Sequence, residues 1–465
     1  MNFLKKIERF DSNICFIDVN DKKVLYKNIL MKSEKLSKDL EPRSLIFVLA
    51  QNHIEFFTSY VGFFRKGLVQ MLLDPKISTF LLKELIETYM PNYIFLPNSR
   101  KNDLKNYEVL SNLDNHRILK LNESNSYSLN KDLALLLSTS GSTGSKKFVR
   151  ISYENIYHNT KNIVNFLGIY GRHRTITTMP PFYTYGLSVI NTHLFAGASI
   201  LVTNLKAIEK AFWQLMRDQK ICSFAGVPYF YEILNKIKFD KFDLPDLKYF
   251  TQAGGALRKD LIKYFLIYSE KNKKEFIVMY GQTEATARMT YLPYKMLRKK
   301  IGSVGIPITG GKIHLVSDKS KRDKKGEIIY EGKNVSLGYA KNFKDLAKKD
   351  ENKGILKTGD LAVKDSDGYL YITGRKSRDI KLFGHRVSLD EVEQILFKKG
   401  YNCRCCGFDN KVTIFHIDNT YNGEILKYIS RQTNIHLDCF KLKHIKEFPL
   451  NENGKASYEK LEKFL

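Results

Sequence analysis

The feature that most constrains the fold is the regular alternation of short apolar runs with amphipathic stretches through the first 270 residues. RSLIFVLA is followed by the helical pattern HIEFFTSYVGFFRKG, and LVQMLLD by TFLLKELIETYM, before the run NYIFLP. The same rhythm returns from GASILVT to LKYFTQAGG and a helix that starts near Leu257. Strands that alternate with helices form parallel sheets with helices on their faces. We therefore predict a large amino-terminal α/β domain with parallel-rich sheets.

The pattern changes after about residue 300. Short alternating strands with turn signals occur in KIHLVSD, GEIIYEG and GILKTGDLAVKDSDGYLYITG, which favour a small antiparallel, barrel-like part. Beyond Arg375 a compact segment holds the helical patterns SLDEVEQILFKK and SYEKLEKFL. We expect that segment to form a small α+β domain of its own.

One loop has almost no apolar side chains. TSGSTGSKK follows the apolar run LALLLS, so it is expected at the carboxyl end of a strand, where open α/β sheets bind ligands. Backbone N–H groups freed by glycines form anion-binding concavities, and short hydroxyls and lysines add donors and charge. A flexible linker is the alternative, but linkers seldom separate a strand from a helix so closely, and the spacing does not match a Walker A loop. The residues expected to bind phosphate are Thr139, Ser140, Gly141, Ser142, Thr143, Gly144 and Lys147.

This loop resembles the phosphate loop of the adenylate-forming ligases, the superfamily of acyl-CoA synthetases, luciferases and nonribosomal peptide synthetase adenylation domains. Six further segments resemble motifs of that family in the same order: GGAL at Gly254, YGQTEA at Tyr280, GEIIYEGKNVSLGY at Gly326, KTGDLA at Lys357, GRKSRDIKLFGHRV at Gly374 and NENGKAS at Asn451. The resemblance thus covers nearly the whole chain. It implies an ATP- and acid-binding domain over residues 1–374, a mobile lid domain over 378–465 and a hinge at about 375–377.

The resemblance also implies the nucleotide site. Tyr280 offers a flat face for adenine, Thr283 a hydroxyl for the α-phosphate and Glu284 a hard carboxylate ligand for Mg²⁺. Asp360 and Arg375 are implied to bind the ribose. The other residues implied to bind ATP or AMP are Gly254, Gly255, Ala256 and Gly281. Singly, each has a structural alternative, such as a core tyrosine, a turn aspartate or a surface arginine.

Other implied roles belong to the carboxyl-terminal region. Lys455 is expected to neutralise charge between the substrate carboxylate and ATP while an acyl-adenylate forms. Ser377 falls at the hinge position, where Asp or Lys is commoner in the family. The loop expected to line a tunnel for a thiol includes Lys381, Gly384 and Arg386.

Two departures from the family pattern stand out. Lys146, Lys147 and Phe148 replace Pro-Lys-Gly after the phosphate loop, and Lys146 and Phe148 have no functional account. The predicted acid pocket contains Tyr183, Thr184, Tyr185 and Gly186. Thr184 stands at the position where amino-acid-activating relatives carry an aspartate. An α-ammonium would be left unpaired there, which is costly, so we expect an acid without an α-amino group. Tyr185, Tyr229 and Phe230 fit either an apolar pocket or core packing.

Composition narrows the remaining choices. The chain of 465 residues carries a formal charge of +27, but its lysines are dispersed and no nucleic-acid motif is found, so nucleic acid is disfavoured as a partner. A general lysine-rich bias of the sequence is the favoured explanation of the charge, although a phosphate-bearing substrate or an acidic carrier protein would benefit from it. No apolar run suggests a signal peptide or a membrane span, which predicts a cytoplasmic protein. Cys403, Cys405 and Cys406 are interpreted as small apolar strand residues, since no second metal-ligand pair follows.

The sequence therefore predicts an ATP- and Mg²⁺-dependent acid ligase that forms an acyl-adenylate and then a thioester with coenzyme A. The alternative is an adenylate-forming enzyme that loads a carrier-protein phosphopantetheine or an amine. No carrier domain follows NENGKAS, so such a carrier is expected to be separate. A nucleotide-binding regulatory protein is less favoured because Glu284, Asp360, Arg375 and Lys455 are all present. The sequence does not identify the acid.

Overall fold

The chain folds into two compact units. The computed structural model describes residues 3–121, 127–139, 147–317, 325–382, 385–408, 411–419, 421, 423–433, 435–451 and 455–465. The first unit contains Met1–Lys312 and Glu331–Leu356, and the second contains Ile313–Tyr330 and Lys357–Leu465. The predicted hinge at residues 375–377 thus lies within the second unit, and its role stays a prediction.

The first unit contains an eight-stranded sheet with the order β19-β9-β8-β4-β3-β5-β7-β6. Its strands are β3 (Leu45–Leu49), β4 (Val69–Leu73), β5 (Tyr93–Pro97), β6 (Tyr107–Asn112), β7 (His116–Leu121), β8 (Leu133–Ser138), β9 (Phe148–Ser152) and β19 (Tyr339–Ala340). The central strands β8, β4, β3 and β5 are parallel, and antiparallel strands flank them. These central strands are the continuous apolar runs of the sequence, as expected for strands buried on both faces.

A nine-stranded sheet follows in the same unit, with the order β16-β15-β14-β13-β12-β10-β11-β1-β2. Its strands are β1 (Ile14–Ile17), β2 (Lys23–Leu25), β10 (Arg174–Ile176), β11 (Ser199–Leu201), β12 (Ser223–Gly226), β13 (Tyr249–Gln252), β14 (Glu275–Tyr280), β15 (Thr290–Tyr291) and β16 (Ile306–Pro307). The pairs from β1 through β14 in this order are parallel. The predicted parallel-rich α/β fold is confirmed.

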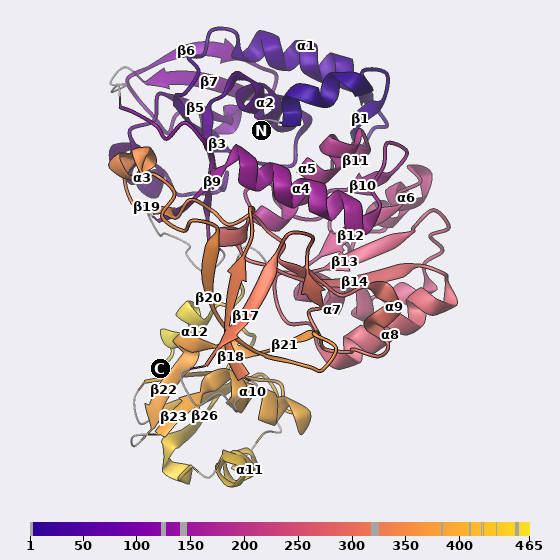
Figure 1. Cartoon of the computed structure of the whole chain (residues 1–465), viewed down its shortest axis with the longest axis vertical. Coiled ribbons are helices and arrows are strands. Elements are labelled where there is room, and N and C mark those ends of the chain that lie inside the picture. The colour runs from indigo at the N-terminus through magenta and orange to yellow at the C-terminus, as the bar shows by residue number, and fades with distance from the viewer. Residues whose placement is uncertain are drawn as a thin grey trace. The chain divides into compact units, whose positions relative to one another are not determined.

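Helices cover these sheets and lie between them. The α-helices are α1 (Tyr26–Ser37), α2 (Ile54–Lys66), α3 (Thr79–Tyr89), α4 (Tyr153–Leu167), α5 (Thr184–Ala196), α6 (Lys210–Asp218), α7 (Pro228–Lys236), α8 (Lys259–Lys271) and α9 (Tyr294–Leu297). Short 3₁₀ helices are Phe3–Phe10, Asn98–Arg100, Phe239–Lys241, Thr283–Ala285 and Phe343–Ala347. The largest core joins buried side chains of α2 and α5 to residues of both sheets, and Figure 1 shows α4 and α5 between the sheets. None of the helices in the described ranges has the length and apolar character to span a membrane.

The predicted phosphate loop joins two strands rather than a strand and a helix. β8 and β9 are antiparallel, with Ser138 paired to Phe148, and α4 begins only at Tyr153. The expected direct passage from strand to helix was therefore wrong. β9 is a buried strand whose apolar pattern is interrupted by Arg150, which is itself fully buried.

The second unit contains a four-stranded sheet and a smaller α/β part. The sheet has the order β17-β18-β20-β21, and its strands are β17 (Lys312–Val316), β18 (Lys325–Glu331), β20 (Ile355–Lys364) and β21 (Leu370–Arg375). The other strands are β22 (Asp379–Leu382), β23 (His385–Ser388), β24 (Cys403–Phe408), β25 (Lys411–His416) and β26 (Phe440–His444). The helices are α10 (Leu389–Lys398), α11 (Glu424–Thr433) and α12 (Tyr458–Glu462), with 3₁₀ turns at Lys376–Arg378 and Leu437–Cys439. A core cluster packs α10 and α11 on the sheet β24-β25-β26.

Candidate functional site

The structure describes both ends of the predicted phosphate loop, Thr139 and Lys147. The middle of the loop lies outside the described residues: Ser140, Gly141, Ser142, Thr143, Gly144 and Lys146. Thr139 directly follows β8, and Lys147 directly precedes β9. The Lys147 ammonium lies 3.5 Å from the centroid of the Tyr339 ring, a cation–π contact. Tyr339 comes from β19, which pairs with β9.

Tyr339 also contacts the predicted magnesium ligand. Its hydroxyl donates a hydrogen bond of 2.7 Å to Oε1 of Glu284. Burial and the nearby Glu284 carboxylate raise the pKa of Tyr339 well above its usual value, so the phenol keeps its proton and stays a donor. One aromatic side chain therefore touches both the lysine at the end of the phosphate loop and Glu284. Sequence reasoning quoted Tyr339 as the last residue of a motif but gave it no role.

Thr283 and the predicted acid-binding segment meet in the first unit. The hydroxyl of Thr184 donates to the hydroxyl of Thr283 over 2.9 Å, and both side chains are buried. Tyr183 precedes α5, while Thr184, Tyr185 and Gly186 form its first turn. The Tyr185 hydroxyl donates to the backbone oxygen of Thr251, at 2.9 Å.

The predicted adenine-binding segments end two neighbouring parallel strands. Tyr280 is the last residue of β14, and Gly254, Gly255 and Ala256 follow the adjacent β13. Parallel strands that end at one edge bring these segments near one another. Gly281 admits no side chain, because a Cβ there would lie 1.7 Å from the carbonyl oxygen of Ala287.

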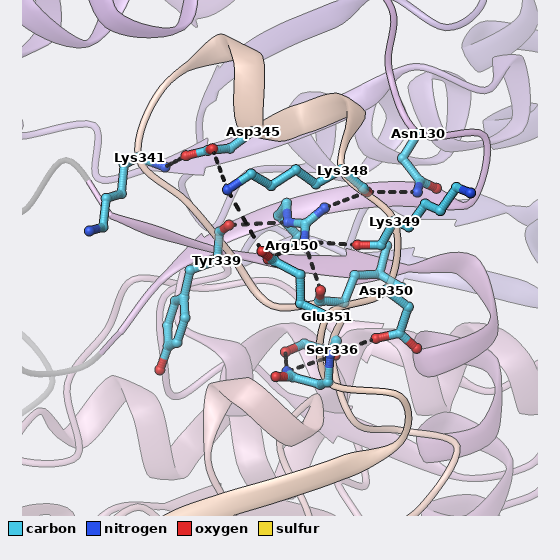
Figure 2. Close-up of polar contacts among 12 residues, drawn as sticks. Asn130, Arg150, Ser336, Tyr339, Lys341, Asp345, Lys348, Lys349, Asp350 and Glu351 are labelled. Carbon is cyan, nitrogen blue, oxygen red and sulfur yellow. Dashed lines mark hydrogen bonds and ion pairs between the residues drawn. The ribbon is translucent and has the colours of Figure 1, made fainter.

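Arg150, on β9, organises the segment that carries Tyr339. Its guanidinium donates to the backbone oxygens of Leu337, Tyr339, Lys348 and Lys349 and to the Glu351 carboxylate, which lies 2.6 Å away (Figure 2). Gly338 fits there because its φ is 115° and a Cβ would come within 2.6 Å of Glu351 Oε2. Arg150 thus fixes the backbone position from which Tyr339 reaches Glu284.

A second fully buried arginine lies at the predicted acid pocket. The Arg288 guanidinium lies 4.4 Å from the centroid of the Tyr185 ring and hydrogen-bonds to the hydroxyl of Ser188. Arg288 was not predicted as a site residue, although it follows YGQTEA by three residues. A position so close to a motif was the available signal, but an arginine is ordinarily read as an exposed residue.

In the second unit, the two predicted ribose ligands form a pair. Asp360 and Arg375 are register partners on β20 and β21, and Nε of Arg375 lies 2.7 Å from Oδ1 of Asp360. Asp360 is buried, whereas the Arg375 side chain is mostly exposed. The pair presents a carboxylate that is oriented by a cation, which suits hydrogen bonding to a diol.

The other predicted residues of the second unit are less completely described. Lys455 and Asn451 exchange hydrogen bonds, with the Lys455 N–H donating to Asn451 Oδ1 over 2.9 Å and the Asn451 N–H donating to the Lys455 carbonyl. Ser377 lies in the 3₁₀ turn Lys376–Arg378, and Lys381 and Arg386 are backbone partners in the hairpin β22–β23. Gly384 lies outside the described residues. Their roles stay predictions.

Arg378, which the sequence analysis did not single out, anchors this turn. Its guanidinium contacts the carboxylates of Asp390 and Glu393 and lies 3.6 Å from the centroid of the Tyr458 ring. The turn at Ser377 is therefore tied to α10 and α12 of the same unit.

A histidine cluster lies elsewhere in the first unit, at the start of α2. Suitable ligand atoms of His53, Glu55 and His116 lie within 4.8 Å of one another. Both ring nitrogens of His116 already have partners, with Nδ1 2.8 Å from Glu55 and Nε2 3.0 Å from the Gln51 amide, while His53 accepts the Glu55 N–H as a helix cap. These bonds make the cluster a network that ties α2 to β7.

The cysteine interpretation is confirmed. Cys403, Cys405 and Cys406 are free and buried on β24. Burial raises the pKa of the Cys403 and Cys406 thiols to about 12, which disfavours the reactive thiolate.

Comparison with known proteins gives the family. Residues 7–340 match the family model described as AMP-binding enzyme, and the chain belongs to this family. It is 30% identical over 278 residues to the probable 4-coumarate–CoA ligase 1 of Dictyostelium discoideum, covering 57% of this chain and 49% of that protein. It is 28% identical over 286 residues to the putative acyl-CoA synthetase YngI of Bacillus subtilis, covering 58% and 50%. The chain thus spans about half the length of the curated relatives it matches.

Solved structures share the fold over the whole chain. ATP-bound MatB from Rhodopseudomonas palustris is 19% identical with a TM-score of 0.82, covering 100% of this chain and 98% of that one. The o-succinylbenzoate CoA synthetase MenE from Bacillus subtilis, in complex with its acyl-adenylate intermediate, is 18% identical with a TM-score of 0.78, covering 99% and 98%. The predicted fold class agrees with these neighbours.

Proposed function

We propose that this protein is an ATP-dependent ligase that activates a carboxylic acid as its acyl-adenylate and transfers the acyl group to a thiol. The observation that carries the proposal is the double contact of Tyr339 with Lys147 and Glu284. It joins a cation at the end of the phosphate loop to a carboxylate suited to Mg²⁺, which is the combination that binding of MgATP requires. The structures of related fold with ATP or an acyl-adenylate support the same reading.

In the first step, a carboxylate oxygen of the acid attacks the α-phosphorus of MgATP, and the bond from that phosphorus to the oxygen bridging to the β-phosphate breaks. Pyrophosphate leaves and the acyl-adenylate remains. The reacting groups are both anionic, so the step needs charge neutralisation and alignment. We assign alignment of the α-phosphate to Thr283, metal binding to Glu284 and charge neutralisation to Lys147 and Lys455.

In the second step, a thiolate attacks the acyl carbon, a thioester forms and AMP leaves. Coenzyme A is the proposed acceptor, as the names of the curated relatives suggest for those proteins. The formal charge of +27 favours a second candidate acceptor, the phosphopantetheine of a separate acidic carrier protein. The mobile-lid role of residues 378–465 and the tunnel role of Lys381, Gly384 and Arg386 belong to this step.

The acid we propose lacks an α-ammonium group. Thr184, which stands at the position of the aspartate in amino-acid-activating relatives, uses its hydroxyl to bond Thr283. The amino end of α5 starts at the same residue, and free N–H groups at a helix start favour an anion over a cation. An unpaired ammonium here would be costly to desolvate.

Trapping of the adenylate tests this function. Purified protein is incubated with MgATP, hydroxylamine and a panel of acids, and pyrophosphate and hydroxamate are measured with and without coenzyme A. We expect acid-dependent release of pyrophosphate that Lys455→Ala lowers by roughly 100-fold or more, while Lys463→Ala, a change of an exposed lysine on the same segment, leaves it unchanged. Wild-type rates in Lys455→Ala would remove the assignment of that lysine. Absence of any acid-dependent release across the panel would remove the proposed function.

A further inference from the structure

Arg288 is a buried cation without an anionic partner. Only 2% of its surface is exposed, and within the described residues the charged-form partners around it are tyrosines, with no carboxylate among them. Its Nε has no hydrogen-bond partner there either. The contacts it does make are neutral: the Ser188 hydroxyl and the face of the Tyr185 ring.

Such an arrangement is costly for the free protein. A buried charge is ordinarily paired and hydrogen-bonded, because the loss of water must be offset. A cation–π contact offsets only part of that loss. In agreement, burial lowers the pKa of Arg288 from its usual value. A structural role gives no reason to keep a guanidinium here, since a methionine of similar length would pack with less cost.

Two further buried polar atoms without partners belong to residues linked with Arg288. The Nε2 atom of His193 has no partner in the described residues. Burial lowers the pKa of His193 to about 4, and the positive charge of Arg288 contributes to this lowering. The Asn159 side chain donates to the backbone oxygen of Arg288, over 2.7 Å, while its own Oδ1 has no partner. Groups of unsatisfied buried polar atoms mark places where a polar ligand or water completes the bonding.

The location connects these atoms with the acid substrate of the proposed function. Arg288 contacts Tyr185, and Tyr185 directly follows Thr184, whose hydroxyl bonds that of Thr283. Arg288 also lies four residues after Glu284 in the chain. The unpaired guanidinium is thus next to the segment that we assign to the acid.

We propose that the acid substrate carries a second carboxylate, which pairs with Arg288 while the first carboxylate is adenylated. This inference rests on the proposed function and narrows it from carboxylic acids to dicarboxylic acids. Arg288 is then a residue that determines specificity. A guanidinium suits this task because its planar set of donors matches a carboxylate bidentately.

Matched pairs of acids test the proposal in the wild-type protein. Hydroxamate formation with MgATP is compared for butanoate and succinate, pentanoate and glutarate, hexanoate and adipate, and benzoate and the three benzenedicarboxylates. For the pair that fits the pocket best, we expect kcat/KM to favour the diacid by roughly 100-fold or more, because the monoacid leaves the buried charge unpaired. Equal or better turnover of the monoacid throughout would overturn the inference while leaving the ligase function standing. No hydroxamate with any acid would instead count against the ligase function itself.

Two variants locate the effect. Arg288→Met should lower kcat/KM for the preferred diacid by roughly 100-fold and leave the matched monoacid within about threefold. Arg288→Lys keeps the charge without the planar donors, so its kcat/KM for the diacid should lie between the values for the wild-type protein and for Arg288→Met. Stabilisation of the wild-type protein by the diacid, measured as a shift in melting temperature, should disappear in Arg288→Met. A diacid preference that persists in a folded Arg288→Met protein would assign the discrimination to another residue and overturn the proposal.

Discussion

Two buried arginines of the first unit differ in how completely their charges are satisfied. Arg150 is 0% exposed and contacts four backbone oxygens and the Glu351 carboxylate (Figure 2). Arg288 is 2% exposed and contacts a hydroxyl and an aromatic ring, with its Nε unpartnered in the described part of the chain. The two guanidinium groups are therefore equally buried, but only that of Arg150 has an anionic partner in the described part of the chain.

The difference separates a structural role from a binding role. Arg150 donates to four backbone carbonyls of the segment 337–351 and to Glu351, so its guanidinium holds this segment against β9. The Arg288 guanidinium contacts two neutral side chains of α5, Ser188 and Tyr185, and donates to no backbone carbonyl in the described part of the chain. A buried polar group without a partner in the protein needs an explanation, and a bound ligand or an ordered water supplies one.

The largest expected effect is on stability at Arg150. Arg150→Met removes a donor that four backbone carbonyls and the Glu351 carboxylate share, and the Leu337 carbonyl among them is buried, so we expect the free energy of unfolding of the first unit to fall by about 3–5 kcal/mol. Urea denaturation followed by the fluorescence of Trp213, the single tryptophan and a buried residue of this unit, measures it. A loss below about 1 kcal/mol would show that the network of Figure 2 is dispensable.

Removal of the anionic partner alone should cost less. Glu351→Gln keeps the backbone acceptors of Arg150 and deletes one charge whose side chain is 47% exposed, so the expected loss is about 1–2 kcal/mol in the same urea experiment. Asp350→Asn, a neighbouring change that leaves the Arg150 contacts intact, is the control. If both changes had the same effect, the ion pair would add nothing to the carbonyl contacts.

Tyr339 connects the Arg150 network with the proposed MgATP site, so its hydroxyl should affect catalysis more than stability. Tyr339→Phe keeps the ring in contact with Lys147 and removes the hydrogen bond to Glu284. We expect binding of MgATP to weaken by about 1 kcal/mol, which raises the KM for MgATP roughly fivefold. Pyrophosphate release at varied MgATP measures this effect. A wild-type KM at every magnesium concentration would remove the positioning role.

The smallest expected stability effect is at Arg288. Arg288→Met replaces an unpaired buried cation by an apolar side chain of similar length. The free energy of unfolding should therefore change by less than about 1 kcal/mol, in either direction. The Trp213 measurement applies again. A loss comparable to that of Arg150→Met would show that both arginines serve the fold, and the comparison between them would fail.

The sequence predicted the order of strands and helices well because most of these elements are long apolar or amphipathic runs. The helical pattern HIEFFTSYVGFFRKG ends with Gly67, and α2 stops there with φ of 90°, a conformation that few other residues adopt readily. β9 was not recognised as the partner of β8, because a buried arginine interrupts its pattern and the acceptors of Arg150 lie about 190 residues farther along the chain.

Site residues followed the same division. Asp360 and Arg375 were predicted separately from two motifs, and the sheet register pairs them. Arg288 and Tyr339 were overlooked because their roles depend on partners from distant segments: Tyr185 and Ser188 for the first, Lys147 and Glu284 for the second. Long-range contacts of this kind leave no local spacing in the sequence.

The six cysteines have a practical consequence. All of them are free and buried, in both units of the chain. Thiol reagents attack exposed thiolates, so the natural cysteines should react slowly in the folded protein. A cysteine introduced at one exposed position in each unit could then carry a spectroscopic label without replacement of any natural thiol. Distances between such labels, with and without nucleotide and acid, would report directly on movement between the units.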